Sequence, residues 1–258
     1  MALNTPIKNW PAQRVWIIGA STGIGAALAE LLHARGARVA LSARSRDKLD
    51  ALAARLGERA LALPLDITDL ESLRAADTAL GGRWGGYDLV VFMAGDYVAM
   101  RAWEIDLAVA RRMVATNWEG ILNGLSLVIP RFLAAKAGNI ALVSSVAGYR
   151  GLPKALVYGP TKAALINLAE TLYIDLKPKG IDVCVINPGF VKTPLTANND
   201  FEMPYLISPE EAAREIVAGL EKGEFEIHFP KAFTRMLKFL RHLSYPLYFK
   251  AVNRLARP

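Results

Sequence analysis

Short runs of apolar residues alternate with segments of helical periodicity along most of this chain. Runs that are apolar throughout, rather than at every second position, are typical of strands that are buried on both faces of a sheet. Such strands are expected at residues 14–18, 38–43, 60–64, 89–92, 140–144, 182–187 and 225–229. Helices are expected at residues 23–35, 47–56, 70–80, 155–176 and 209–221, with two more between residues 106 and 135. The alternation predicts an α/β fold with a doubly wound parallel sheet, whose ligand lies beyond the carboxyl ends of the strands.

The length of 258 residues and the 53% of apolar residues suit one large domain, expected over residues 1–230 and followed by an extension over residues 231–258. The N-terminus lacks the features of a signal peptide, and the apolar stretch at residues 120–135 is too short and too interrupted to span a bilayer. Cys184 is the only cysteine and lies in an apolar run, so it is interpreted as a core residue. A single cysteine forms no internal disulfide, which favours the cytoplasm.

The net charge of +7 is concentrated at the C-terminus. Residues 231–258 contain seven Lys or Arg and no Asp or Glu, whereas residues 1–230 carry equal numbers of basic and acidic residues. A surface for an anionic partner is therefore expected in the extension rather than in the body of the protein.

A glycine-rich loop joins the first expected strand to the first expected helix. The loop contains Gly19, Gly23 and Gly25 with Ser21, Thr22 and Ile24 between them. The first glycine permits a tight turn, the second lets backbone N–H groups approach a pyrophosphate, and the third lets helix and strand pack closely. A plain glycine-rich turn is the alternative, but the position of the loop between strand and helix favours a dinucleotide site.

The residues that follow the second and third expected strands are candidates for binding the adenosine half of such a dinucleotide. The second strand ends at Ala43 and Arg44, where an acidic residue would select NAD by accepting from the ribose 2′-hydroxyl. A guanidinium instead pairs with a 2′-phosphate, so NADP(H) is the expected cofactor, and a solvated surface arginine is the alternative. Asp66 follows the third strand and could contact the adenine amino group, or serve only as a helix cap or turn residue.

Tyr158 and Lys162 are four residues apart, which places them on one face of a helix. A free phenol has a pKa of about 10, and a neighbouring ammonium group favours the phenolate and lowers that pKa. Lys162 is therefore expected to bring Tyr158 into the range in which it transfers protons. Ser145, at the end of a strand, is placed to hydrogen-bond an oxygen on which negative charge develops.

Taken together, these motifs resemble those of the short-chain dehydrogenase/reductase (SDR) family over about residues 14–230. The resemblance rests on the glycine loop, Tyr158 with Lys162, and several further positions. These further positions are Asp66, Ala94-Gly95, Asn117, Ser144-Ser145 and Asn187-Pro188-Gly189.

The resemblance implies a Rossmann-fold oxidoreductase with the catalytic tetrad Asn117, Ser145, Tyr158 and Lys162. In the family, the asparagine of this tetrad holds a helix distortion and a water that links the lysine to solvent, and the lysine also binds the nicotinamide ribose. It also implies that further residues bind the cofactor, and that the chain forms a homo-oligomer through residues 120–135 and 155–176. These further cofactor residues are Ala94, Gly95, Pro188, Gly189, Val191 and Thr193.

One position departs from the family pattern, because Met93 stands where an asparagine usually precedes Ala94-Gly95. Met93 is expected to pack, so that the change affects stability or cofactor affinity more than chemistry. No metal is expected, since His33, His228 and His242 lack the spacing of metal ligands.

The expected activity is NADPH-dependent hydride transfer between nicotinamide and a carbonyl or alcohol carbon. A substrate loop is expected at residues 190–207, where Phe201, Met203, Pro204 and Tyr205, joined by Tyr97 and Tyr149, favour a hydrophobic, lipid-like substrate. Two alternatives stay open, namely a non-catalytic NADP(H)-binding redox sensor and an NAD-linked alcohol dehydrogenase working in the oxidative direction.

The extension at residues 231–258 carries Phe233, Met236, Leu237, Leu240 and Leu243 at near-helical spacing, and Pro246 is expected to separate this helix from a second one. These helices could cap the pocket, form a subunit interface or bind peripherally to anionic membrane. Nucleic acid is the weakest of the partners considered, because nothing else in the chain supports it.

Overall fold

Seven strands and nine helices follow one another in the computed structural model, which describes residues 2–197 and 203–255. The strands are β1 (Arg14–Ile18), β2 (Arg38–Ser42), β3 (Ala60–Ala62), β4 (Leu89–Phe92), β5 (Gly138–Val143), β6 (Ile181–Pro188) and β7 (Glu226–Phe229). The helices are α1 (Gly23–Ala34), α2 (Arg46–Leu56), α3 (Leu70–Trp84), α4 (Leu107–Val114), α5 (Gly120–Ala135), α6 (Tyr158–Leu176), α7 (Pro209–Lys222), α8 (Lys231–Arg241) and α9 (Tyr245–Leu255).

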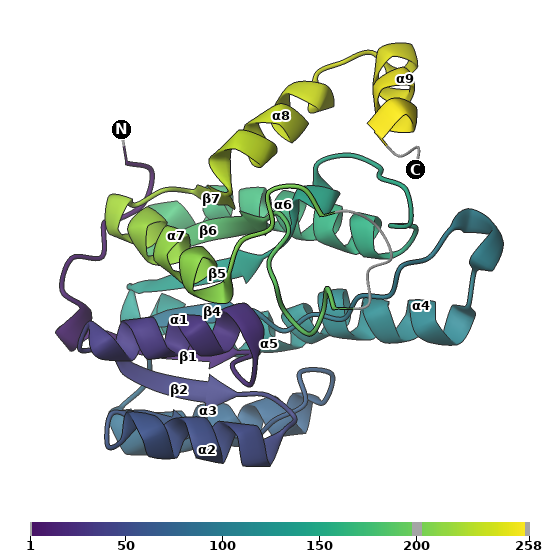
Figure 1. The fold of residues 1–258 in the computed structure, drawn as a ribbon. Coiled ribbons are helices and arrows are strands. Elements are labelled where there is room, and N and C mark those ends of the chain that lie inside the picture. Colours follow the sequence, from purple (N-terminus) through teal and green to yellow (C-terminus); the bar gives the residue numbers. More distant parts are fainter. Residues whose placement is uncertain (1, 198–202, 256–258) are drawn as a thin grey trace.

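All seven strands form one parallel sheet in the order β3-β2-β1-β4-β5-β6-β7 (Figure 1). The chain builds outward from β1 to β3, returns to the centre, and then builds outward from β4 to β7. The strand order therefore reverses between β1 and β4, and the connections leaving their carboxyl ends diverge. Such a switch point is where open α/β sheets bind their ligands.

Two hydrophobic layers cover the two faces of the sheet. Side chains alternate along β1, so that Trp16 and Ile18 belong to one layer and Val15 and Ile17 to the other. Helices α3, α5 and α6 complete the first layer, and α1, α2 and α7 complete the second. The predicted doubly wound α/β fold is thereby confirmed, with every expected strand and helix present.

The differences from the expected boundaries have local causes. Helix α3 runs through Gly81 and Gly82 and ends only at Gly85, whose φ of 74° is left-handed. Helix α6 begins at Tyr158 rather than at residue 155. The segment expected to hold two helices between residues 106 and 135 is nearly continuous, because a π-helical turn over Ala115–Glu119 joins α4 to α5.

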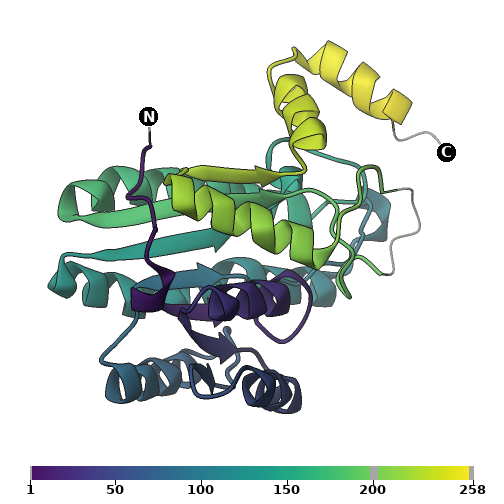
Figure 2. The same ribbon diagram turned by 60° about the vertical axis from the view of Figure 1, so that its left-hand side comes forward.

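The C-terminal extension forms the two expected helices, and they differ in their position relative to the sheet. Helix α8 is anchored through the buried Phe233 and Leu237 and α9 through the buried Tyr248 and Val252, and α9 lies furthest from the sheet in both views (Figures 1 and 2). Pro246 occupies the first turn of α9, where its missing N–H leaves no helical hydrogen bond unmade. The break between the helices falls just before it, at residues 242–244.

Candidate active site

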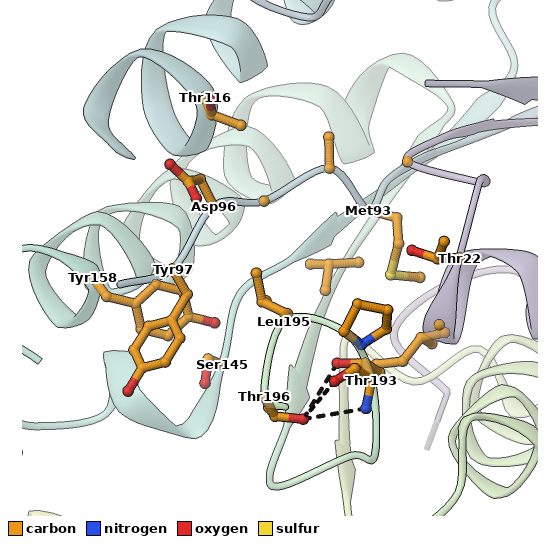
Figure 3. A pocket seen from close by; sticks show the side chains of 18 of the residues that line it. Thr22, Met93, Asp96, Tyr97, Thr116, Ser145, Tyr158, Thr193, Leu195 and Thr196 are labelled. Atoms are coloured by element: carbon orange, nitrogen blue, oxygen red, sulfur yellow. Dashed lines mark hydrogen bonds between the residues drawn. The ribbon is translucent and has the colours of Figure 1, made fainter. Parts of the chain in front are cut away.

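An open groove runs along the carboxyl ends of the central strands, at the switch point between β1 and β4. Its volume is about 1060 Å³, which is at the upper end of ligand sites in proteins. Thr22 and Met93 lie toward one end and Tyr97, Tyr158 and Ser145 toward the other (Figure 3). The structure thus brings most of the expected site residues to one place. Those that line the groove are Gly19, Ser21, Thr22, Gly23, Ile24, Gly25, Arg44, Asp66, Ala94, Gly95, Ser145, Tyr158, Lys162, Pro188, Gly189, Val191 and Thr193.

The glycine loop needs its glycines for reasons of space. Gly19 has a φ of 112°, and a Cβ there would lie 2.5 Å from the backbone nitrogen of Ala94. A Cβ on Gly25 would lie 2.1 Å from the carbonyl oxygen of Gly19. Larger residues at either position would push the loop away from the strands. The close approach of loop, helix and neighbouring strand is the arrangement expected of a dinucleotide-binding turn.

The first turn of α1 faces the groove with uncapped backbone donors. Thr22 is the N-cap of this helix and its side chain accepts no capping hydrogen bond. Gly23 has a φ of 56°, and a Cβ there would lie 3.0 Å from the Thr193 Cγ2 atom across the groove. A helix N-terminus with open N–H groups and no intervening side chain suits a phosphate. The residues present therefore fit the pyrophosphate of a dinucleotide.

At the end of β2, the groove is lined by a basic side chain and, among the described residues, by no acidic one. Ala43 and Arg44 both line the groove, and no ion pair to Arg44 is found among the residues that the structure describes. Asp66 also lines it, but its Oδ1 accepts from the backbone N–H of Thr68 at 3.0 Å and from the Thr68 hydroxyl at 2.8 Å. Asp66 therefore has the turn role that was considered as its alternative, in addition to its place at the groove.

Met93 packs as expected. Its side chain lines the groove near Thr22 and also contacts the apolar layer on the α1 side of the sheet (Figure 3). The backbone N–H groups of Met93 and Ala94 both donate to the Ile18 carbonyl, so the backbone keeps β1 and β4 together at this point. An apolar surface consequently replaces an amide in the wall of the adenosine half.

Ser145 and Tyr158 converge at the other end of the groove from two different elements. Ser145 follows β5, and its Oγ accepts from the Ala147 N–H at 3.1 Å. Tyr158 is the first residue of α6, and its ring meets that of Tyr97 edge to face at a centroid distance of 4.8 Å. Burial raises the pKa of the Tyr158 phenol to about 12, although hydrogen bonding with Ser145 acts in the opposite direction.

Lys162 lies one turn further along α6 and is buried. Its Nζ donates to the Val143 carbonyl at 2.9 Å and lies 5.5 Å from the centroid of the Tyr158 ring. Burial lowers the pKa of Lys162 to about 8, because the interior disfavours the ammonium form. The pKa of Tyr158 is thus raised rather than lowered as expected, because burial of the phenol dominates and the effect that opposes it comes from Ser145 rather than from Lys162.

Asn117 occupies the π-helical turn between α4 and α5 rather than the wall of the groove. Its side chain pairs with the backbone of Asp96 in both directions, accepting from the N–H and donating to the carbonyl, each at 2.8 Å. A Cβ built on Gly95 would lie 3.6 Å from both Asn117 Oδ1 and Lys162 Nζ. Asn117 therefore fixes the position of Gly95 and Asp96, the segment after β4, and Gly95 lies between Asn117 and Lys162.

The substrate end of the groove mixes apolar and charged side chains. Tyr97, Val98 and Leu195 line it, and four charged residues line it as well. Those charged residues are Asp96, Arg101, Glu104 and Lys154. Tyr149 was expected here and does not line the groove, because its hydroxyl is turned to Glu226 at 2.7 Å in the interior. Phe201 lies outside the described residues.

Sequence reasoning missed Glu226, a residue of β7 whose carboxylate links Lys238 on α8 to Asn187 on β6. Its carboxylate accepts from the Tyr149 hydroxyl, from Asn187 Nδ2 at 2.9 Å and from Lys238 Nζ at 2.5 Å. Burial alone would raise the pKa of Glu226, but the hydrogen bonds from these three groups lower it below its usual value. No local motif marks this residue, since its partners lie 77, 39 and 12 positions away.

Sequence and structure comparisons place the chain among known oxidoreductases. The model of the short chain dehydrogenase family matches residues 13–203. An uncharacterized oxidoreductase of Myxococcus xanthus is 36% identical over 93% of this chain and 96% of its own length.

Solved structures agree with these matches. A short-chain dehydrogenase of Burkholderia cenocepacia in complex with NADP is 25% identical, has a TM-score of 0.81 and covers both chains completely. A 3-ketoacyl-(acyl-carrier-protein) reductase of Brucella melitensis complexed with NADH is 25% identical with a TM-score of 0.79, over 84% of this chain and 96% of that one. This chain therefore belongs to the short-chain dehydrogenase/reductase family of oxidoreductases.

Proposed function

We propose that this protein is an NADPH-dependent reductase in which Tyr158 gives a proton to the carbonyl oxygen of a hydrophobic substrate. The observation that carries the proposal is the convergence of Tyr158 and Ser145 in the groove, with Lys162 beside them on the same helix. The bound nicotinamide would supply the hydride. The residues that would hold the cofactor are the glycine loop and α1 N-terminus at the phosphates, Arg44 and Asp66 at the adenosine, and the Pro188 to Thr193 segment with Lys162 at the nicotinamide half.

The protonation states suit the proton transfer that carbonyl reduction requires. A phenol with a pKa of about 12 is neutral at pH 7 and is therefore ready to donate a proton. Ser145 can donate a hydrogen bond to the same carbonyl oxygen as negative charge develops on it. Lys162, with a pKa of about 8, is mostly cationic at pH 7 and lies close enough to stabilise the phenolate that remains after proton transfer.

Arg44 supports the choice of NADPH over NADH. Arg44 lines the groove just after the end of β2, where no carboxylate accompanies it among the lining residues of that strand end. A guanidinium can pair with a 2′-phosphate in two parallel hydrogen bonds. The Burkholderia cenocepacia structure holds NADP and the Brucella melitensis structure holds NADH, so the proposal of NADPH for this chain rests mainly on Arg44.

The apolar residues near Tyr158 support a hydrophobic carbonyl substrate. Tyr97, Val98 and Leu195 line the groove beside the reacting hydroxyls. Aliphatic or aromatic substrates would bury apolar surface at this end, which is favourable in proportion to the area removed from water.

The substitution Tyr158→Phe tests the catalytic assignment. It removes one oxygen from a buried ring, so we expect NADPH to bind with unchanged affinity while carbonyl reduction falls by at least about a thousandfold, within the contribution that acid–base catalysis makes. NADPH binding is measured by the fluorescence of the cofactor, and turnover by its absorbance in a screen of aldehydes and ketones. Retention of a tenth or more of the wild-type rate would remove Tyr158 from the chemistry. A wild type that binds NADPH and reduces none of the carbonyls would favour the redox sensor, and faster alcohol oxidation with NAD would favour the dehydrogenase alternative.

We also propose a homo-oligomer that uses α5 and α6. Leu122 and Leu133 on α5 and Ile174 on α6 are exposed apolar side chains, and both helices lie on the same face of the sheet. Exposed apolar groups on adjacent helices are typical of surfaces that a partner covers. Light scattering gives the mass in solution, and the mass of a single chain at micromolar concentration would contradict this proposal.

A further inference from the structure

The C-terminal extension exposes aromatic and aliphatic side chains to an unusual degree. Phe239 on α8 is 67% exposed, and on α9 Tyr245 is 69% exposed and Leu247 and Phe249 are each 56% exposed. The rings of Tyr245 and Phe249 stack on one another at 5.8 Å between centroids. Four large apolar side chains within eleven residues make a surface that water covers poorly.

Packing of the extension on the body does not account for these side chains. A different set faces inward, namely Phe233 and Leu237 on α8 and Tyr248 and Val252 on α9, all of which are buried. The inward stripe already provides the apolar face that each short helix needs in order to dock. Docking of the two helices on the body therefore accounts for the buried set, and the exposed set remains to be explained.

The charge around the exposed set has a single sign. Residues 231–258 contain seven basic and no acidic residues, and Arg235, Arg241, Lys250 and Arg254 are exposed on the two helices. Lys238 is paired with Glu226 and takes no part in this surface. Exposed rings next to cations that no acid of the same segment neutralises are the chemistry of a protein surface that meets anionic lipid headgroups.

The extension is held in a fixed place beside the mouth of the groove. The guanidinium of Arg150 donates to the carbonyls of Leu240, Arg241 and Leu243 at the end of α8, at 3.1, 3.3 and 2.7 Å. It also lies over the ring of Tyr248 at 3.9 Å, and the Tyr248 hydroxyl donates to the Gly151 carbonyl at 2.6 Å.

The same loop, residues 150–157, borders the substrate end of the groove. Lys154 lines the groove, and its carbonyl accepts from the Met100 N–H at 2.9 Å. Three residues after Met100 comes Trp103, which is another exposed aromatic residue. A surface that contacts α9 therefore lies next to the entrance of the site.

We propose that the exposed face of α8 and α9, which we name the docking face and define by Phe239, Tyr245, Leu247, Phe249, Lys250 and Arg254, binds peripherally to the surface of an anionic lipid bilayer. The aromatic rings would enter the headgroup region while the cations contact lipid phosphates. A second copy of the chain fits less well, because a two-fold contact would bring together two basic extensions that lack acidic residues. Nucleic acid is also disfavoured, because the aliphatic Leu247 shares the surface with the cations.

This placement has a consequence that rests on the proposed function. Binding through the docking face brings the entrance of the groove to the lipid surface, so that the substrate class is a carbonyl compound that partitions into membranes. Among the described residues, no helix is both long and apolar enough to cross a bilayer.

The test uses the full-length protein without cofactor or substrate, so that its outcome is independent of catalysis. Flotation is compared between vesicles of phosphatidylcholine alone and vesicles that contain phosphatidylglycerol. We expect flotation with the anionic vesicles only, and loss of flotation in about 0.5 M salt, where charges are screened within a few ångströms. Tyr158→Phe should float like the wild type even if it is inactive. A wild type that does not float with anionic vesicles overturns the proposal.

Matched variants locate the surface. Leu247 lies on α9, and its control Leu3→Glu changes the same residue type at a similar exposure, 53%, near the N-terminus, which is drawn apart from α9 in both views (Figures 1 and 2). We expect Leu247→Glu, and more strongly Leu247→Glu with Phe249→Glu, to lower vesicle binding by about tenfold or more, since an exposed apolar side chain that would enter the headgroup region is replaced by a negative charge. Leu3→Glu should have no effect.

Two outcomes of this comparison would refute the docking face. The first is equal binding of the Leu247→Glu and Leu3→Glu variants. The second is a change of oligomeric mass in the α9 variants with unchanged vesicle binding, which would assign the surface to a second copy. The neutral pair Lys250→Gln with Arg254→Gln leaves every apolar contact in place, so it keeps the test decisive if a glutamate variant folds poorly. Wild-type vesicle binding by this pair would also overturn the proposal.

Discussion

The buried Lys162 makes a contribution to the free energy of unfolding that increases as the pH rises through the alkaline range. Its pKa is lowered from 10.5 to about 8 by burial. A difference of this size means that the charged form costs about 3 kcal/mol more in the folded protein than in the unfolded chain. Between pH 8 and 10.5 the unfolded chain therefore binds the additional proton at this residue, and the contribution of Lys162 to stability rises with pH across this window.

The substitution Lys162→Met removes this dependence. The variant loses the donor to the Val143 carbonyl, which costs about 1–3 kcal/mol. This loss offsets the gain from removing a buried charge, so a comparison of the two free energies of unfolding at a single pH does not test the argument. The difference between the two proteins is nevertheless expected to change by about 3 kcal/mol from pH 7 to pH 10.5, in favour of the wild type at high pH. With a denaturant slope of about 3 kcal/mol/M, the urea midpoints should move by about 1 M relative to one another.

Urea unfolding followed by circular dichroism at several pH values measures this change. Lys179→Met serves as the control, because Lys179 is an exposed lysine just beyond the end of the same helix. Its midpoint should stay parallel to that of the wild type. Parallel profiles for Lys162→Met as well would show that Lys162 does not titrate abnormally, and the electrostatic account of the site would then fail.

Three further substitutions separate the roles of other residues. Arg44→Ala should raise the KM for NADPH by about ten- to a hundredfold, the value of a hydrogen bond to a charged group, and equal effects on NADH would make Arg44 a surface charge only. Phe233→Ala should cost about 3 kcal/mol in the free energy of unfolding, because the ring is buried between Phe190 and Tyr205, and a loss below about 1 kcal/mol would show that α8 is loosely packed. Arg150→Ala should speed hydrogen exchange in α9 by about tenfold or more through loss of charged hydrogen bonds, without rescue by Arg150→Lys, and unchanged exchange would contradict the anchoring role.

The sequence predicts the sheet and the groove well because both follow from local patterns. The apolar runs mark strands that are covered on both faces, and the glycine loop marks the turn at which backbone must approach backbone. Tyr158 and Lys162 are found because they are neighbours on one helix. The positions of Ser145 and Asn117 came from the family resemblance together with the strand pattern, and their contacts with Pro188 and Asp96 emerge only in the folded chain.

Pairings between distant side chains were beyond prediction. Tyr149 was assigned to the substrate pocket because aromatic residues often line such pockets, yet its hydroxyl finds Glu226 on the last strand. The sign of the Tyr158 pKa shift was also misjudged, because a charge neighbour is visible in the sequence and the depth of burial is not. Leu156 and Val157 read as helical, but the chain enters α6 only at Tyr158.

Arg150 has a consequence for attempts to exchange C-terminal segments between family members. Its guanidinium fills the role of a helix C-cap for α8, although it belongs to a loop some ninety residues earlier in the chain. A chimera that receives only residues 231–258 would therefore lose the Arg150 hydrogen bonds to the Arg241 and Leu243 carbonyls and the cation over the Tyr248 ring. The loop at residues 150–157 must therefore be transferred together with the segment. The two parts form one structural unit although they are far apart in the sequence.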